Sequence, residues 1–173
     1  MASKKNINRY IDPRNISFKY PLLEKGFNKT DLKKGMEVLK SGFITMNKHT
    51  EIFEKEFAKR LKIKFALMVN SGSSANLLAT FAACNPLRKN RFKNGDEVLI
   101  PVLCWSTSLW PLVQAGLKPK FVDIDPKTLN VNANNLISKI TKKTKVILLI
   151  NVLGISADLV KIRNFAKKKG III

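Results

Sequence analysis

A chain of 173 residues, 45% apolar and 25% charged, can bury one hydrophobic core, which excludes a disordered polypeptide and a pair of ordinary domains. Its 32 Lys and Arg against 12 acids give a formal net charge of +20, which suggests an anionic partner such as nucleic acid, an acidic membrane surface or a phosphorylated ligand. Only six of the basic residues are Arg and the lysines are dispersed, so we interpret most of them as solvated surface and expect neither a membrane nor a nucleic-acid partner.

The beginning of the chain is polar, and we predict an irregular N-terminal segment over residues 1–27, where Pro13 and Pro21 disfavour a helix. A helical pattern then begins at Thr30, which can cap it, and Gly42 ends it. Its apolar face is expected to consist of Leu32, Met36 and Leu39. This helix opens the main domain, which we place at residues 28–173.

A second helix is expected from about His49 to Leu61. Its apolar residues recur at helical spacing, and its charged residues occupy the opposite side. The pattern therefore predicts that Ile52, Phe53 and Phe57 point inward.

Beyond residue 64 short apolar runs alternate with helical segments. We expect strands near 65–69, 97–100, 120–124, 146–150 and 171–173. We expect helices near 72–84, 105–115, 132–140 and 157–168. The runs are continuously apolar, as suits parallel strands that are covered on both faces. The sequence thus predicts an α/β fold, a three-layer α/β/α arrangement with a mostly parallel sheet, and a final strand at which the domain is truncated.

In a parallel α/β sheet, ligands gather at the carboxyl ends of the strands, and the loop before the first of the later helices suits an anion. Gly72 permits a close approach to the backbone, while Ser73 and Ser74 supply N–H groups and hydroxyls at the positive end of a helix. The loop lacks the glycine patterns of nucleoside-triphosphate and dinucleotide sites. An ordinary capped helix start explains these residues equally well.

The loop after the next strand contains Trp105, which is either a core residue or a flat surface on which an aromatic ring can stack. A third loop, residues 151–158, contains Gly154 at a turn. A phosphate cradle beside an aromatic platform suits a phosphorylated planar ligand, and pyridoxal phosphate has this character.

The sequence offers few residues for metal binding, disulfide formation or a Ser-His triad. His49 is the only histidine, and Cys84 and Cys104 stand twenty residues apart without a CxxC pattern, so we expect no metal site, disulfide framework or Ser-His triad. No leader-like stretch or membrane-length apolar run occurs, and we expect a cytoplasmic protein.

From about residue 20 to its end, the chain resembles the DegT/StrS family of PLP-dependent nucleotide-sugar aminotransferases and related sugar 3-dehydratases. The matching stretches are "YPLLEKGFNKTDLKKGMEVLKSGFITMNKHTEIFEKEFAKRL", "VNSGSSANLLA", "NGDEVLIPVLCWSTSLWPLVQAGLKPKFVDIDPKTLNVN" and "VLGISADLVKI". The resemblance implies the N-terminal half of a fold-type I large domain, with pyridoxal 5′-phosphate as cofactor and a homodimer when full length. Gly72, Ser73 and Ser74 would bind its phosphate, and Trp105 would stack on its ring.

The resemblance also implies a substrate, a nucleotide-linked keto-sugar, and for an aminotransferase an amino donor. In the family the acid that pairs with the pyridinium nitrogen, and the Schiff-base Lys or the His that replaces it, follow residue 173, so no residue here is assigned as catalytic and this chain alone is not expected to transaminate. At two positions the chain differs from the family's pattern, with Asn151 in place of a common His and Ser156 in place of a Pro. Because of these differences, the resemblance does not specify the substrate. The loop Asn85 to Asn94 and the pair Leu153-Gly154 resemble the dehydratase branch, which is the alternative to aminotransfer. A non-catalytic basic α/β module that binds nucleic acid is the alternative from another class.

Overall fold

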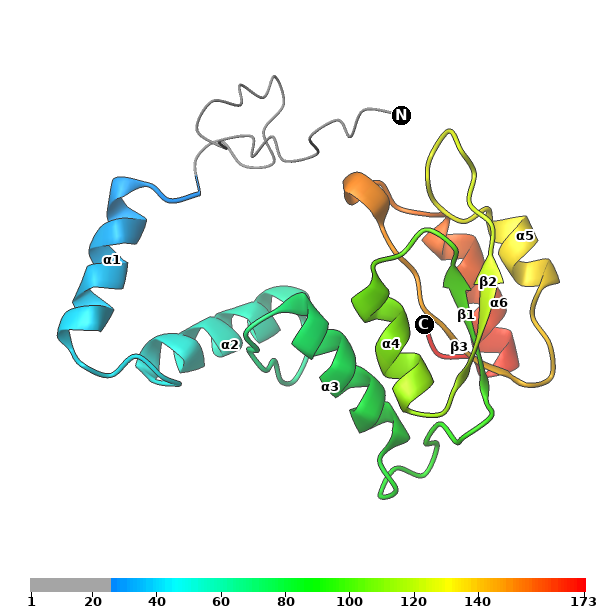
Figure 1. Cartoon of the computed structure of the whole chain (residues 1–173), viewed down its shortest axis with the longest axis horizontal. Helices are drawn as coiled ribbons and strands as arrows, with labels where there is room; N and C mark the ends of the chain where they lie inside the picture. The colour runs from blue at the N-terminus through cyan, green and yellow to red at the C-terminus, as the bar shows by residue number, and fades with distance from the viewer. Residues whose placement is uncertain (1–25) are drawn as a thin grey trace, which may run out of the picture. The chain divides into compact units, whose positions relative to one another are not determined.

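The computed structural model describes residues 26–173, which fall into two compact units, one ending at Met68 and one running from Val69 to Ile173. Each unit is described by itself (Figure 1). The predicted irregular segment 1–27 lies almost entirely outside the described residues, so its boundary at residue 28 remains a prediction.

Two helices make up the first unit, α1 (Lys29–Lys40) and α2 (Lys48–Leu61). Asn28 caps α1, two residues before the Thr30 cap that the sequence predicted. Its Oδ1 accepts hydrogen bonds from the N–H groups of Thr30 at 2.8 Å and Asp31 at 3.0 Å, and the Asn28 N–H donates to Asp31 Oδ2 at 2.9 Å. Asn28 rather than Thr30 is the N-cap because Asp31, three residues after Asn28, completes a reciprocal capping box.

The apolar face of α2 is exposed, which corrects the prediction that it points inward. Ile52, Phe53 and Phe57 are 47%, 50% and 43% exposed, and Ala58 is the one buried residue of the helix. The Phe53 and Phe57 rings stack on each other with centroids 5.6 Å apart. An amphipathic pattern predicts that a face can be covered, but no described residue supplies that cover.

The run at 65–69 is not a strand, although its length and composition predicted one. Phe65 and Leu67 are 76% and 66% exposed, and the Met68 N–H donates to the carboxylate of Glu54 at 2.8 Å rather than to a neighbouring strand. A strand exists only where a partner satisfies its backbone groups, and no described strand pairs with this run.

The second unit is built on a parallel three-stranded sheet in the order β2-β1-β3 (Figure 1). Its elements in chain order are α3 (Gly72–Cys84), β1 (Glu97–Pro101), α4 (Ser106–Gln114), β2 (Lys118–Val122), α5 (Ala133–Ser138), β3 (Thr144–Ile147), the 3-10 turn η2 (Val152–Gly154) and α6 (Leu159–Lys169). The strands β2 and β3 each begin two residues before the predicted position. The predicted last strand begins beside β3, because Ile172 forms a parallel bridge with Val146.

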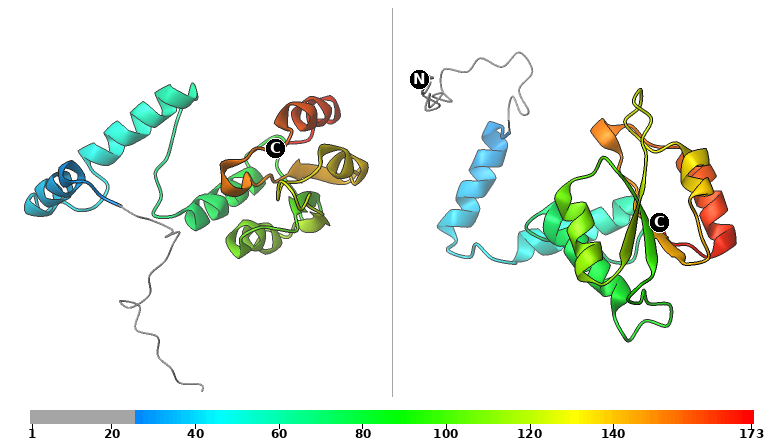
Figure 2. Two further views of the ribbon diagram at one scale, coloured as in Figure 1. Left: turned by 90° about the horizontal axis from the view of Figure 1, so that it is seen from above. Right: turned by 45° about the vertical axis from the view of Figure 1, so that its right-hand side comes forward.

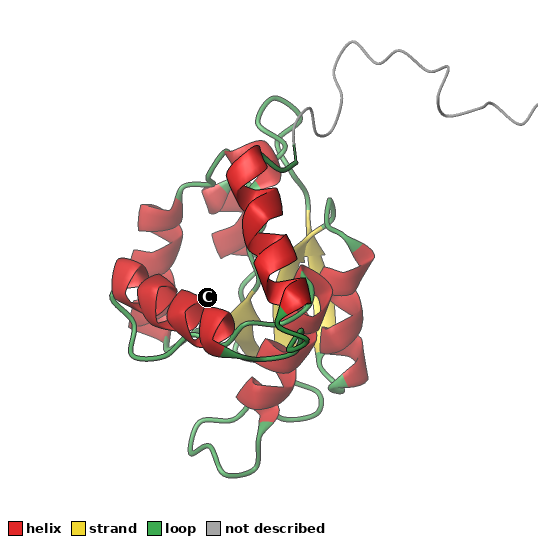
Figure 3. Cartoon of the chain, turned by 90° about the vertical axis from the view of Figure 1, so that its left-hand side faces the viewer, coloured by secondary structure: helices red, strands yellow, loops and turns green. Residues whose placement is uncertain are grey.

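The core lies on both faces of β1. Val98, Leu99 and Ile100 are all fully buried, but Leu99 belongs to a cluster with residues of α5 and α6, while Val98 and Ile100 belong to a cluster with Leu112 of α4. The helices accordingly lie on opposite sides of the sheet (Figure 2), and helices form the greater part of the regular structure (Figure 3). The predicted three-layer α/β/α fold with a parallel sheet is confirmed.

Candidate phosphate cradle at the carboxyl ends of the strands

The first turn of α3 contains the predicted glycine and serines, and Ser71 caps it. The Ser71 backbone is extended, and its Oγ accepts a hydrogen bond from the Ser74 N–H at 3.1 Å. The Ser71 hydroxyl also lies 3.2 Å from Ser74 Oγ, to which it donates. The cap therefore uses the Ser74 amide, so of the polar groups of Ser74 the hydroxyl, and not the N–H, remains able to donate to a ligand.

The amides of Gly72 and Ser73 remain available. Helix geometry gives the N–H groups of a first turn no acceptor inside the helix, and the described residues supply none from elsewhere. A Cβ placed on Gly72 would meet no atom within 4 Å, so the space beside the Gly72 Cα is open. The first turn of α3 contains no acidic residue, and the positive end of the helix dipole is uncompensated. The start of α3 fits a phosphate group.

A side chain joins this turn to the next loop of the sheet edge. Asn76 Nδ2 donates to the carbonyl oxygen of Thr107 at 3.3 Å and lies 3.4 Å from Ser108 Oγ. Ser108 is 7% exposed, so the contact forms at the edge of the core. The starts of α3 and α4 are thus held together, and with them the glycine-serine turn and the loop that contains Trp105.

Trp105 occupies the N-cap position of α4 and makes no capping hydrogen bond. Its side chain is 75% exposed, which excludes the core alternative for this ring within the described structure. An exposed indole that precedes a helix start can serve as a stacking surface. Trp110, one turn further along α4, is 56% exposed.

The third loop is joined to the loop after β2 by Asn130, a residue that sequence reasoning missed. Asn130 is 3% exposed, and its Oδ1 accepts from the Val152 N–H at 3.3 Å while its Nδ2 donates to the Thr128 carbonyl at 2.9 Å. In the same loop Leu153 has a φ of 53° and is 84% exposed. A buried amide with partners in two loops fixes the positions of both loops. Sequence reasoning missed this role because nothing in the sequence distinguishes Asn130 from Asn132.

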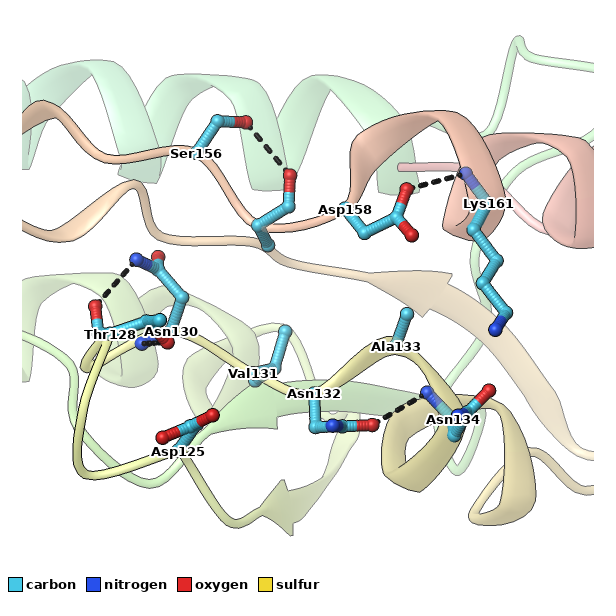
Figure 4. Close-up of a pocket in the computed structure, with 11 residues that line it drawn as sticks. Asp125, Thr128, Asn130, Val131, Asn132, Ala133, Asn134, Ser156, Asp158 and Lys161 are labelled. Carbon is cyan, nitrogen blue, oxygen red and sulfur yellow. Dashed lines mark hydrogen bonds between the residues drawn. The ribbon is translucent and has the colours of Figure 1, made fainter.

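A pocket of about 250 Å³ lies between these two loops (Figure 4). None of the four predicted cofactor residues lines it. Its polar groups already serve as helix caps: Asp158 Oδ1 accepts from the Lys161 N–H at 3.1 Å, and Asn132 Oδ1 from the Asn134 N–H at 2.9 Å. We regard this pocket as a junction between loops, distinct from the cradle at α3.

Titratable groups give no sign of a nucleophile at this edge. Burial raises the pKa of the Cys104 thiol, so the reactive thiolate is scarce. Within residues 26–173, no group of three or more His, Cys, Asp and Glu side chains is placed to hold a metal ion. In the same range, no helix is long and apolar enough to cross a membrane.

Comparison with protein families gives a match over residues 27–173 to the model of the DegT/DnrJ/EryC1/StrS aminotransferase family. Among curated relatives, the GDP-4-keto-6-deoxy-D-mannose 3-dehydratase of Yersinia pseudotuberculosis is 41% identical over 160 residues, which cover 92% of this chain and 40% of that protein. The GDP-perosamine synthase of Vibrio cholerae is 30% identical over 152 residues, covering 87% of this chain and 40% of that protein.

Among solved structures, the Escherichia coli GDP-4-keto-6-deoxy-D-mannose-3-dehydratase with bound hydrated PLP matches with a TM-score of 0.81 at 40% identity, over 88% of this chain and 39% of that one. The chain thus spans about two fifths of the length of these relatives. The structural match shows that the chain has the fold of part of this PLP-bound enzyme.

Proposed function

The chain belongs to the DegT/DnrJ/EryC1/StrS aminotransferase family, and from this premise we propose that it contributes the pyridoxal-phosphate cradle of an enzyme acting on a nucleotide-linked keto-sugar. The observation that carries the proposal is the start of α3, where two amides have no acceptor among the described residues and the space beside the Gly72 Cα is open. The activity is proposed for the whole protein, of which relatives suggest that this chain is about two fifths.

The residues of the cradle have separate tasks. The N–H groups of Gly72 and Ser73 and the hydroxyl of Ser74 would hold the phosphate by donating hydrogen bonds, helped by the positive end of α3. The exposed ring of Trp105 would provide a stacking surface for the pyridine. Asn76 holds the two parts in register. When bound, pyridoxal phosphate supplies an electron sink for bond cleavage next to its amine-bearing carbon.

For the reaction we propose loss of the sugar 3-hydroxyl. Two relatives named as GDP-4-keto-6-deoxy-D-mannose 3-dehydratases are 41% and 44% identical to this chain, whereas the GDP-perosamine synthases are 30% and 31% identical. The long loop Asn85 to Asn94 supports the same branch. Aminotransfer to the sugar carbonyl is the second candidate, supported by the family description. Mass spectrometry of the nucleotide sugar after incubation of the whole protein with an amino donor separates loss of a hydroxyl from gain of an amine.

We further propose that the whole protein is a cytoplasmic homodimer. The exposed apolar faces of α1 and α2 support an interface, since Leu32, Met36 and Phe53 are each at least half exposed. An amino donor and a nucleotide sugar are its small-molecule partners.

The cradle can be tested on the chain itself with pyridoxamine 5′-phosphate. This vitamer has an amine in place of the aldehyde, so it cannot condense with the many lysines. We expect it to bind, and we expect pyridoxamine without phosphate to bind at least tenfold more weakly. A tenfold loss corresponds to about 1.4 kcal/mol, which is the size of one or two charge-assisted hydrogen bonds.

Gly72→Val tests the open space directly, because its side chain would fill the space beside the Gly72 Cα. We expect at least a tenfold loss of pyridoxamine 5′-phosphate affinity. Gly35→Val is the matched control, since a Cβ at Gly35 also meets nothing within 4 Å but lies on α1. Equal losses from the two substitutions, or equal binding of the two vitamers, would refute the cradle.

A further inference from the structure

The amino ends of the three strands form a second functional surface. Glu97, Lys118 and Thr144 begin β1, β2 and β3 and pair side by side. The segments before these strands are bonded together, with the Gly95 N–H donating to the Gly116 carbonyl at 2.8 Å and the Glu97 N–H donating to the Lys143 carbonyl at 3.0 Å. This end of the sheet, which we call the amino face, lies opposite the cradle and at the lower side of the second unit in Figure 1.

The amino face is strongly basic. Its exposed cationic side chains number eleven: Arg88, Lys89, Arg91, Lys93, Lys118, Lys142, Lys143, Lys145, Lys167, Lys168 and Lys169. Within the described residues none of the eleven forms an ion pair. The two carboxylates at this end are already engaged, since Asp96 accepts from the Lys93 N–H at 2.8 Å and Glu97 accepts from the Thr141 hydroxyl.

Two ordinary causes of surface lysine do not account for this charge. Cations favour the last turn of a helix, but of the helices that end at this face only α6 carries basic residues there, Lys167, Lys168 and Lys169. General enrichment in lysine would charge both ends of the sheet. The carboxyl-end loops and the first turn of α6 instead hold three aspartates, at positions 123, 125 and 158, against Lys127, Lys161 and the ammonium of Lys139, which pairs with Asp123 at 3.6 Å.

One loop of the amino face adds an apolar tip. Leu87 is 92% exposed and is held in a turn in which its N–H donates to Asn85 Oδ1 at 2.9 Å and the Arg88 N–H donates to the Asn85 carbonyl at 3.0 Å. Arg88 and Lys89 follow it directly. An apolar side chain among cations matches the boundary between lipid headgroups and acyl chains.

We propose that the amino face docks on an anionic lipid bilayer, with Leu87 inserted among the headgroups. Nine of the eleven cations are Lys, which act as point charges toward a field of phosphates. A single-stranded nucleic acid would need exposed aromatic rings for its bases, and the Phe92 of this face is half-buried against the core. Docking in this way leaves the cradle at the opposite end of the sheet open to water. The proposal does not depend on the function proposed for the cradle, and it revises the expectation that the lysines are only solvated surface.

Co-sedimentation of the full chain with vesicles tests the docking. We expect binding to vesicles in which about a third of the lipid is phosphatidylglycerol, little binding to pure phosphatidylcholine, and release at roughly 0.5 M NaCl. Replacement of five amino-face lysines by Gln should weaken binding at least tenfold: Lys142, Lys143, Lys167, Lys168 and Lys169. The matched control has the same change of net charge and replaces five exposed lysines of the first unit by Gln: Lys29, Lys33, Lys40, Lys48 and Lys55.

Two further variants keep the test decisive. A variant with Gln at Arg88, Lys89, Arg91 and Lys93 removes charge without touching a helix terminus, and it should also bind at least tenfold more weakly. Leu87→Ser should weaken vesicle binding about threefold or more while leaving retention by duplex DNA unchanged. The proposal is overturned if the first-unit control loses as much binding as the amino-face variant. It is equally overturned if the chain does not bind anionic vesicles at low salt. It is also overturned if the chain binds duplex DNA more tightly than vesicles and Leu87→Ser does not change vesicle binding.

Discussion

Asn76 in α3 and Thr107 at the start of α4 are joined by a side-chain hydrogen bond of 3.3 Å from the Asn76 amide to the Thr107 carbonyl. The bond links two helices whose N-termini both lie at the carboxyl end of the sheet. It uses a carbonyl of the first turn of α4, so the position of the Trp105 loop depends on a residue one turn into α3. The relationship explains how a glycine-serine turn and an aromatic loop become parts of one site.

Replacement of Asn76 by Ala should lower the free energy of unfolding by about 1 kcal/mol, the usual value of one partly buried hydrogen bond. It should also weaken pyridoxamine 5′-phosphate binding, because the two loops lose their connection. Urea denaturation and a fluorescence titration measure the two effects. Asn164→Ala in α6 is the matched control, since Asn164 is exposed and should show neither effect. Equal behaviour of the two variants would mean that the bond has no structural role.

Trp105→Leu should reduce affinity for pyridoxamine 5′-phosphate about five- to tenfold, because an aromatic pair is worth about 1 kcal/mol beyond the area that it buries. Stability should hardly change, since the ring is 75% exposed. Trp110→Leu provides the control in the same helix and should retain full affinity. A larger loss from Trp110→Leu would move the stacking surface to that residue.

Glu97 predicts a dependence of stability on pH. The Thr141 hydroxyl donates to its carboxylate and, with help from Lys120, Thr144 and Lys143, holds the pKa of Glu97 below its ordinary value of 4.5. Because the pKa in the folded chain lies below that of the unfolded chain, the carboxylate contributes stability above pH 4.5, and this contribution is lost as the pH falls through the folded value. Thr141→Val should therefore lower the urea midpoint at pH 7 and have much less effect at the acidic end of the titration.

Glu51→Gln on α2 is the reference for this titration, as its side chain is exposed. It should leave the difference between neutral and acidic midpoints unchanged. A Thr141→Val effect that persists at acid pH would assign the role of Thr141 to its bonds with Thr144 and Lys143 instead.

Lys62 ends α2 with a φ of 54°, in the left-handed region that favours glycine. Lys62→Gly should raise the free energy of unfolding by about 0.5 kcal/mol, since removal of about 1 kcal/mol of backbone strain outweighs the extra freedom of the unfolded chain. Lys62→Ala retains the Cβ and should give no gain. Thermal denaturation measures both variants, and a destabilised Lys62→Gly would contradict the strain.

Local patterns predicted most of the second unit. The apolar run at β1, the turn before α3 and the stop at Gly170 all depend on residues within a few positions of one another, and Gly170 indeed has a φ of 66°. The start of the cradle could be predicted for the same reason, since a helix N-terminus carries free amides wherever it occurs. The assignment of phosphate to Gly72, Ser73 and Ser74 remains a prediction.

Features that depend on contacts between distant segments could not be predicted from local sequence patterns. The run at 65–69 had the composition of a buried strand, but a composition does not supply a neighbouring strand. The apolar residues of α2 were expected inside for a similar reason. Asn76 and Asn130 were missed because each acts on a loop 22 or more residues away, through contacts that exist only after folding.

The burial of Val98, Leu99 and Ile100 on alternating faces of β1 has a consequence for how the second unit unfolds. The two apolar clusters lie on opposite faces of the sheet, and β1 contributes residues to both of them, as β3 does with Ile147 and Val146. Of the three strands in the described sheet, β1 has ladder partners on both sides. Any opening that exposes its backbone to solvent must therefore breach both clusters at once. The amides of Leu99 and Ile100 should exchange with deuterium only through global unfolding of the unit, at a rate common to both helical layers.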